Sequence, residues 1–274
     1  MKTLLTRSIS GLIFVALVVL SLTLDPIFFL GFISMVVCIG LFEFHKLFSI
    51  ENQFQHPWLI TVLLGFMSFL SLVLPSYLIY TFRFNLTLLV PVLILCYGLL
   101  QLLIYKEKSR SFFLFIAAIL YIVVPFYLAF EIHLKDTGTI PIILGVFLLV
   151  WTNDTFAYLS GNLLGKHKLY EKVSPNKTWE GFAGGITFSI IVGFVLDHYL
   201  YMDAGYASYF WTKAAVFIAP SAVAGDLFQS ALKRRMSVKD TGNIMPGHGG
   251  VLDRFDAMLF ALPVFFLLLY FGAI

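Results

Sequence analysis

Charge is scarce in this 274-residue sequence. Asp, Glu, Lys and Arg make up 12% of the residues, against roughly a quarter in ordinary soluble domains. Hydrophobic residues make up 60%, and the mean hydropathy is +0.93. A soluble fold of this size has too little interior to hide so much apolar surface, and a disordered chain needs low hydrophobicity with high charge. Both classes are excluded, and a polytopic membrane protein remains.

Cysteine is also scarce, and the net charge is small. The two cysteines, Cys38 and Cys96, both lie inside apolar runs, which favours small buried hydrophobes over a disulfide or a metal pair. The net charge of +3 is too small to indicate nucleic-acid binding, so we expect no nucleic-acid partner. The sequence has no internal repeat, and it lacks the matched broken helices that many transporters carry in both halves.

What the sequence has is a series of long apolar runs. The first follows Lys2 and Arg7 and is not followed by a small-residue cleavage site, which indicates a retained span instead of a signal peptide. The runs lack the alternation of strands, and backbone groups in lipid must be satisfied within the segment. The predicted fold class is therefore all-α, a polytopic integral membrane protein with about nine transmembrane helices. After the first, the segments lie at about 26–45, 58–76, 84–104, 112–132, 140–160, 181–201, 211–232 and 254–273.

The distribution of basic residues predicts the orientation of these helices. If the N-terminus is cytoplasmic, 15 of the 18 Lys and Arg residues fall on the cytoplasmic side. Such a bias is typical of cytoplasmic connections. We therefore expect a cytoplasmic N-terminus and, with an odd number of spans, a C-terminus outside.

The two halves of the chain differ in character. Residues 1–135 have short connections and few charges within the membrane, and we expect them to serve packing, dimerisation or the entrance of lipid. Residues 136–274 are the expected catalytic region, with cytoplasmic loops at 161–180 and 233–253 that are rich in polar residues and glycine. Binding and catalytic residues gather on such loops.

Three aspartates stand out near the last loop. Asp226 lies within the eighth apolar segment, and Asp253 and Asp256 are three residues apart at the start of the ninth, so a helix places them on one face. A carboxylate at membrane depth costs roughly 2.5–3.5 kcal/mol on insertion scales, so it normally faces a polar cavity or a partner. Carboxylates from two neighbouring helices can form an all-oxygen site for Mg²⁺.

Basic residues and a glycine-rich turn accompany these carboxylates. In the turn Pro246–Gly250, which contains His248, backbone amides can approach an anion closely. The nearby basic residues are Lys233, Arg234, Arg235 and Lys239. The combination suits a nucleotide polyphosphate with its metal. In a simpler alternative, the aspartates form salt bridges with neighbouring basic residues, Asp226 with Lys233 for example, and the turn has no role.

A second polar segment surrounds the other loop. Its candidate nucleotide-contacting residues are Asn153, Asp154, Ser174, Lys177 and Thr178. Lys177 and Thr178 directly precede the seventh apolar segment, where a helix N-terminus favours anions. The structural alternative is that Ser174 or Thr178 caps that helix, with Glu180 in its first turn.

The stretch from Ser230 to Asp256 resembles the signature of the phosphatidate cytidylyltransferase family, also called CDP-diacylglycerol synthases. The residues that carry the resemblance are Ser230, Lys233, Arg234, Lys239, Asp240, Pro246, His248, Gly249, Gly250, Asp253, Arg254 and Asp256. The segment from Ser174 to Gly181 is also similar to the family's. Met245 is a mild departure, because the family usually has Leu, Ile or Phe there. These motifs cover roughly the C-terminal 45% of the chain.

The resemblance implies an activity and its partners. The reaction is CTP plus phosphatidic acid giving CDP-diacylglycerol plus pyrophosphate, in phospholipid biosynthesis. It implies a multi-pass enzyme of the cytoplasmic (inner) membrane whose active site faces the cytoplasm, in contact with membrane lipids, and a homodimer. It also implies Mg²⁺ held by Asp226, Asp253 and Asp256, and a monovalent cation such as K⁺ beside it is compatible with the family.

The expected roles follow from the chemistry of joining two polyanions. The catalytic group is predicted to comprise Asp226, Lys233, Arg234, Lys239, His248, Asp253, Arg254 and Asp256. The substrate-binding group is predicted to comprise Asn153, Asp154, Ser174, Lys177, Thr178, Gly249 and Gly250. The main rival function is a cation transporter with intramembrane aspartates as its ion path. Clustering of the charges on the cytoplasmic side, beside long polar loops, favours the enzyme.

Overall fold

The structure is a computed structural model that describes residues 2–50, 54, 56–77, 89–100, 109–136, 138, 140–201, 206–244, 249–272 and 274. Within these residues, six helices are long and apolar enough to cross a membrane: Pro26–Ser49, Trp58–Tyr77, Ser111–Lys135, Ile142–Leu164, Trp179–Leu200 and Phe210–Arg235. The predicted all-α polytopic membrane fold is confirmed. The number of spans and the orientation of the termini stay predictions.

Each of the nine predicted apolar segments overlaps a helix among the described residues. The α-helices are α1 (Lys2–Thr23), α2 (Pro26–Ser49), α3 (Trp58–Tyr77), α4 (Leu89–Leu100), α5 (Ser109–Ala118), α6 (Val124–Lys135), α7 (Ile142–Leu164), α8 (Trp179–Val195), α9 (Phe210–Arg235) and α10 (Leu252–Tyr270). Two π-helical turns, η3 (Ile119–Val123) and η4 (Leu196–Leu200), join α5 to α6 and extend α8. Only part of the predicted segment 84–104 lies within the described residues.

The two predicted loops are shorter than expected, because helices continue into them. Helix α7 ends at Leu164 and α9 at Arg235, so Lys233 and its basic neighbours form the last helical turn. Cationic side chains are favourable there, at the negative end of the helix dipole. The first loop also contains a small antiparallel hairpin of β1 (Lys168–Tyr170) and β2 (Ser174–Thr178), the one element among the described residues that departs from the all-α expectation.

The chain divides into two compact units. The first comprises Met1–Leu134 together with Asp240–Asp253, and the second comprises Lys135–Lys239 together with Arg254–Ile274. The different roles predicted for residues 1–135 and 136–274 stay predictions. The division adds one fact to them: residues 240–253, which carry much of the family signature, pack with the N-terminal helices.

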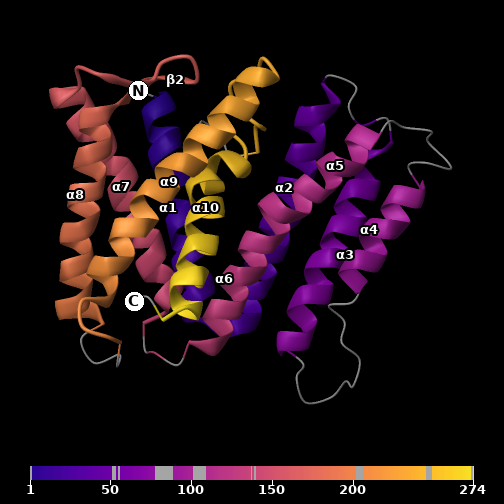
Figure 1. The fold of residues 1–274 in the computed structure, drawn as a ribbon, viewed down its shortest axis with the longest axis horizontal. Coiled ribbons are helices and arrows are strands. Elements are labelled where there is room, and N and C mark those ends of the chain that lie inside the picture. Colours follow the sequence, from indigo (N-terminus) through magenta and orange to yellow (C-terminus); the bar gives the residue numbers. More distant parts are fainter. Residues whose placement is uncertain are drawn as a thin grey trace. The chain divides into compact units, whose positions relative to one another are not determined.

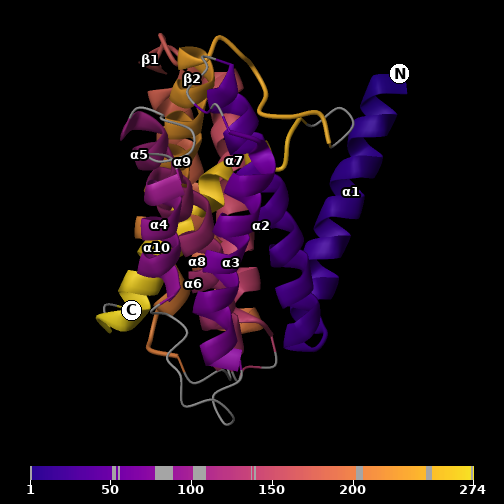
Figure 2. The same cartoon turned by 90° about the vertical axis from the view of Figure 1, so that its right-hand side faces the viewer.

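In the first unit, helices α1 and α2 run antiparallel and are joined by a short turn (Figure 2). Asp25 caps α2 by accepting a hydrogen bond from the Ile27 amide at 3.0 Å, with Pro26 as the first helical residue. Helix α3 packs closely on α2, since a Cβ on Gly65 would lie 2.6 Å from Cδ1 of Leu41. Small residues allow such close approach between membrane helices.

In the second unit, α7, α8 and α9 lie side by side, with the hairpin near the start of α8 (Figure 1). Glycines bring α7 and α8 into backbone contact: a Cβ on Gly181 would lie 2.6 Å from the carbonyl oxygen of Ala157 and 3.2 Å from Cα of Gly161. A Cβ on Gly145 of α7 would collide with the ring of Trp211 on α9. This close packing fixes the backbone positions from which the polar residues of α7 and α9 project.

Candidate active site

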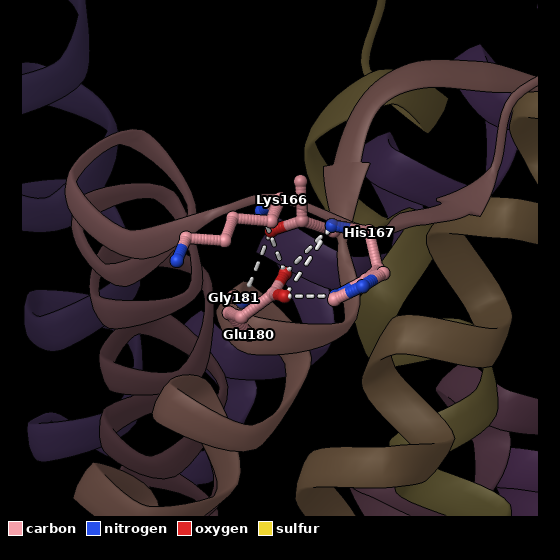
Figure 3. Close-up of polar contacts among 5 residues, drawn as sticks. Lys166, His167, Glu180 and Gly181 are labelled. Atoms are coloured by element: carbon pink, nitrogen blue, oxygen red, sulfur yellow. Dashed lines mark hydrogen bonds and ion pairs between the residues drawn. The ribbon is translucent and has the colours of Figure 1, made fainter.

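Thr178 and Glu180 shape the start of α8. Thr178 is the N-cap residue, and its Oγ1 accepts a hydrogen bond from the Gly181 amide at 3.1 Å. Glu180 accepts hydrogen bonds from the amides of Lys166 (3.1 Å) and His167 (3.2 Å) and contacts His167 Nδ1 at 2.6 Å (Figure 3). The capping alternative for Thr178 is thus confirmed, and Glu180 ties the chain before β1 to the first turn of α8.

Lys177 and Asp226 form an ion pair between β2 and α9. Asp226 Oδ1 also accepts a hydrogen bond from the Ser230 hydroxyl, one turn further along α9, at 3.2 Å. Both partners are about a quarter to a third exposed, at 26% and 31%. The ion pair joins the polar segment before α8 to the polar segment of α9, which the sequence analysis treated as separate candidates. Residues of both segments therefore belong to one charged cluster.

Two more carboxylates belong to this cluster. Asp154 on α7 lies within electrostatic range of Asp226, Lys177 and Arg254. Asp256 on α10 lies within range of Asp226 and Asp154 and of Lys233. Three helices of the second unit therefore each carry one aspartate within electrostatic range of the other two, and Lys177, Lys233 and Arg254 partly offset their charge. Mixed charge of this kind can hold a cation and an anion together.

Residues around the cluster have supporting contacts. Asn153 is fully buried and its Nδ2 donates to Asp154 Oδ1 at 3.4 Å, while a Cβ on Gly185 of α8 would lie 2.6 Å from Asn153 Oδ1. Arg234 donates a hydrogen bond from Nε to the carbonyl oxygen of Val173 at 3.4 Å. Val173 directly precedes β2, so this bond connects the end of α9 to the hairpin. Lys239, the last residue of the first stretch of the second unit, is exposed.

Gly249 and Gly250 of the glycine-rich turn, and Asp253, belong to the first unit. Gly249 has φ +85°, a conformation that favours glycine, and a Cβ there would lie 2.8 Å from Asp253 Oδ2. Asp253 Oδ2 accepts hydrogen bonds from the amides of Thr241 (2.8 Å) and Gly250 (2.9 Å). This carboxylate therefore shapes the turn through its own hydrogen bonds. His248 lies outside the described residues.

The predicted three-aspartate metal site stays a prediction. Asp226 and Asp256 belong to the second unit and Asp253 to the first. Within the described part of the chain, no group of three or more His, Cys, Asp or Glu side chains is arranged to hold a metal ion. The charged cluster of the second unit nevertheless has oxygen donors of the type that Mg²⁺ prefers.

Sequence reasoning missed the buried carboxylate of Glu43 on α2. Its side chain is 1% exposed, and it accepts hydrogen bonds from the amides of Val251 and Leu252, both at 2.9 Å. The available signal was a lone acidic residue inside an apolar segment, which by itself indicates a specific partner.

Comparison with known proteins identifies the family. Phosphatidate cytidylyltransferase of Staphylococcus saprophyticus is 46% identical over 127 residues, which cover 46% of this chain and 48% of the relative. That of Staphylococcus aureus strain COL is 45% identical over the same coverage, and that of Bacillus subtilis is 37% identical over 179 residues, covering 63% of this chain and 66% of the relative. The chain thus matches about half the length of the staphylococcal relatives. A family model described as the cytidylyltransferase family matches residues 5–271, and the chain belongs to that family.

Proposed function

We propose that this protein is a phosphatidate cytidylyltransferase, which transfers CMP from CTP to phosphatidic acid and releases pyrophosphate. One observation carries the proposal: the Lys177–Asp226 ion pair joins the two polar segments, and Asp154, Asp256, Lys233 and Arg254 lie within electrostatic range of this group. A reaction between two polyanions needs such a mixture of acidic and basic groups, which can hold a metal and neutralise phosphate.

The chemistry requires positioning more than a strong base. A phosphate oxygen of phosphatidic acid attacks the α-phosphorus of CTP, a new P–O bond forms, and the bond to the pyrophosphate oxygen breaks. A phosphomonoester has a second pKa of about 6, so the nucleophile is already largely ionised near neutral pH. The protein must bring the phosphates in line and stabilise the charge that moves to the leaving group.

The basic residues supply this stabilisation in our proposal. We assign charge neutralisation of CTP and pyrophosphate to Lys233, Arg234, Lys239 and Arg254, and we assign the pyrophosphate pocket to His248, Gly249 and Gly250. We assign nucleotide contacts to Asn153, Asp154, Ser174, Lys177 and Thr178. The position of Lys177 against Asp226 supports a role at the boundary between the metal region and the nucleotide.

Mg²⁺ fits the chemistry of these residues. All carboxylates of the cluster are hard oxygen donors, and Asp226 already pairs with a cationic group, Lys177. We propose that Asp226, Asp253 and Asp256 hold Mg²⁺, and a monovalent cation such as K⁺ is compatible with the same region. When bound, the metal would neutralise charge on the CTP phosphates.

The membrane fold suits a lipid substrate. The acyl chains of phosphatidic acid would enter from the bilayer while CTP reaches the site from the cytoplasm, so we propose that the site faces the cytoplasm in the cytoplasmic membrane. The homodimer rests on the family resemblance alone, and cross-linking in native membranes would test it.

The proposed activity is tested with the purified full-length chain in lipid–detergent micelles. Labelled CTP and phosphatidic acid should give CDP-diacylglycerol when Mg²⁺ is present and none after chelation. Diacylglycerol is the matched control substrate, because it has the same acyl chains but lacks the attacking phosphate. Absence of product with phosphatidic acid under every divalent metal would exclude the proposed function.

The orientation makes a separate prediction. In a chain whose Cys38 and Cys96 are replaced by Ala, Lys168→Cys should react with an impermeant maleimide only from the cytoplasmic side, because β1 lies on the predicted cytoplasmic loop. Tyr209→Cys is the matched control on the predicted outer connection, and both side chains are exposed. Labelling of both positions from one side would contradict the predicted topology.

A further inference from the structure

Glu43 makes its contacts with the part of the signature that belongs to its own unit. Its side chain is 1% exposed in the C-terminal half of an apolar helix, where a charged group requires specific partners. Oε1 accepts from the Val251 amide at 2.9 Å, and Oε2 accepts from the Leu252 amide at 2.9 Å and from the Thr241 hydroxyl at 3.0 Å. Three donors from residues 241–252 thus converge on one side chain of α2.

Two of these donors belong to the start of α10. Val251 and Leu252 provide amides at the N-terminus of that helix, where backbone N–H groups have no acceptor within the helix. A carboxylate is a strong acceptor for such groups and is also favoured by the helix dipole. Glu43 therefore fixes where α10 begins, and Asp253 follows immediately after the fixed residues.

Thr241 links Glu43 directly to Asp253. Its hydroxyl lies 3.0 Å from Glu43 Oε2 and 3.1 Å from Asp253 Oδ2, while its amide donates to Asp253 Oδ2 at 2.8 Å. A hydroxyl has one hydrogen, so it can donate fully to only one of the two carboxylates at a time. The position of that hydrogen depends on both acidic groups, so a change at Glu43 alters the hydrogen bonding of Asp253.

Two glycines make this arrangement possible. A Cβ on Gly250 would lie 2.5 Å from Glu43 Oε2, and a Cβ on Gly242 would also collide with the Glu43 carboxylate. A side chain at either position would push the Glu43 carboxylate out of its hydrogen bonds. Gly250 in the signature turn thus leaves room for the Glu43 carboxylate, in addition to the room that a glycine-rich turn leaves for an anion.

We propose that Glu43 of α2 is a positioning residue for the reaction, acting through Thr241 to fix the orientation of Asp253 and of the Gly249–Gly250 turn. This inference rests on the proposed function, because Asp253 and the turn are the groups assigned to metal and pyrophosphate. It also assigns a role in the chemistry to a helix of the N-terminal half.

The test uses Glu43→Gln and Thr241→Val in the full-length enzyme. Gln has the size of Glu but replaces one acceptor oxygen by a donor, and Val has the shape of Thr without the hydroxyl. Each should lower kcat by about 10- to 100-fold and raise the Mg²⁺ concentration for half-maximal activity, as is typical when a partner of a metal ligand is lost. Thr241→Ser, which restores the hydroxyl, should return both quantities close to those of the wild type.

Thr61→Val is the matched control. Thr61 is also fully buried in the first unit. Its hydroxyl contacts His45 and His56, at 2.9 and 3.0 Å, and these residues lie outside the stretch Ser230–Asp256. It should leave the Mg²⁺ dependence unchanged. The inference is overturned if Thr241→Val keeps the wild-type kcat and Mg²⁺ dependence, or if Thr61→Val shifts the Mg²⁺ dependence equally.

Hydrogen exchange provides a readout that needs no activity. Glu43→Gln should speed amide exchange in peptides covering residues 240–253 and leave the hairpin peptide 168–178 unchanged. Unchanged exchange in 240–253 would overturn the positioning role even if the wild-type enzyme were inactive. Inactivity of the wild type with CTP and phosphatidic acid would instead count against the proposed function, so the two failures are distinguishable.

Discussion

Replacing Asp226 by Asn should lower the turnover of CTP and phosphatidic acid by roughly a hundredfold to a thousandfold. This range corresponds to several kcal/mol of lost charge stabilisation, the amount that a bound metal supplies in such reactions. Asn has the same size as Asp and still accepts a hydrogen bond from Ser230, so the helix should keep its structure. It carries no charge, however, and Lys177 loses its ionic partner.

The measurement is kcat with saturating substrates, together with thermal melting of the purified protein. Asp25→Asn is the matched control, because Asp25 accepts one hydrogen bond at the start of α2 and Asn caps a helix equally well. Near-normal turnover of the Asp226→Asn enzyme would show that the metal assignment is wrong at this position. Loss of folded protein in the membrane would assign Asp226 a structural role instead.

Gly225→Ala should cause a large structural effect near the site. A Cβ at this position of α9 would collide with the carbonyl oxygen of Asp256 and lie 3.3 Å from Cα of Ala257 on α10. Both contacts are with backbone, so they are relieved only if the helices separate. Overpacking costs about 1–3 kcal/mol, and a displacement of about 1 Å between catalytic groups can cost a hundredfold in rate.

Thermal melting in detergent and the CTP assay should both reveal this effect, as a lower melting temperature and about a hundredfold lower activity. Gly31→Ala is the matched control: Gly31 lies in the second turn of α2, and a Cβ there meets nothing within 4 Å. That control should be neutral or slightly stabilising, since Ala favours helix over Gly by up to about 1 kcal/mol. Equal melting temperatures for the two variants would contradict the close packing of α9 on α10.

The sequence predicts the helices well because each apolar run is long enough to demand one. It fails at their ends, since polar residues such as Asn162 and Lys233 continue a helix as readily as they leave it. The hairpin was missed because strands as short as Lys168–Tyr170 show no measurable alternation. The pairing of Lys177 with Asp226 was missed because the two residues are distant in sequence and only the packed helices bring them together.

The candidate site also has parts that the sequence predicts and parts that it does not. An aspartate within an apolar segment is energetically costly, so the sequence alone is enough to mark Asp154, Asp226 and Asp256 as candidates. Their partners are harder to predict, because a carboxylate does not specify which donor it meets. Glu43 belongs to the same class of residue, and its donors lie 198 to 209 residues further along the chain.

That separation has a consequence for the biogenesis of the protein. Helix α2 leaves the ribosome before the residues that satisfy Glu43 have been made, and synthesis at about 5–20 residues per second takes about 10 to 40 s to reach them. During that interval the acid needs water, a proton or a temporary partner. The contacts of Glu43 in the first unit therefore form only after residue 252 has been made, and a chain cut short before residue 241 leaves Glu43 without these donors.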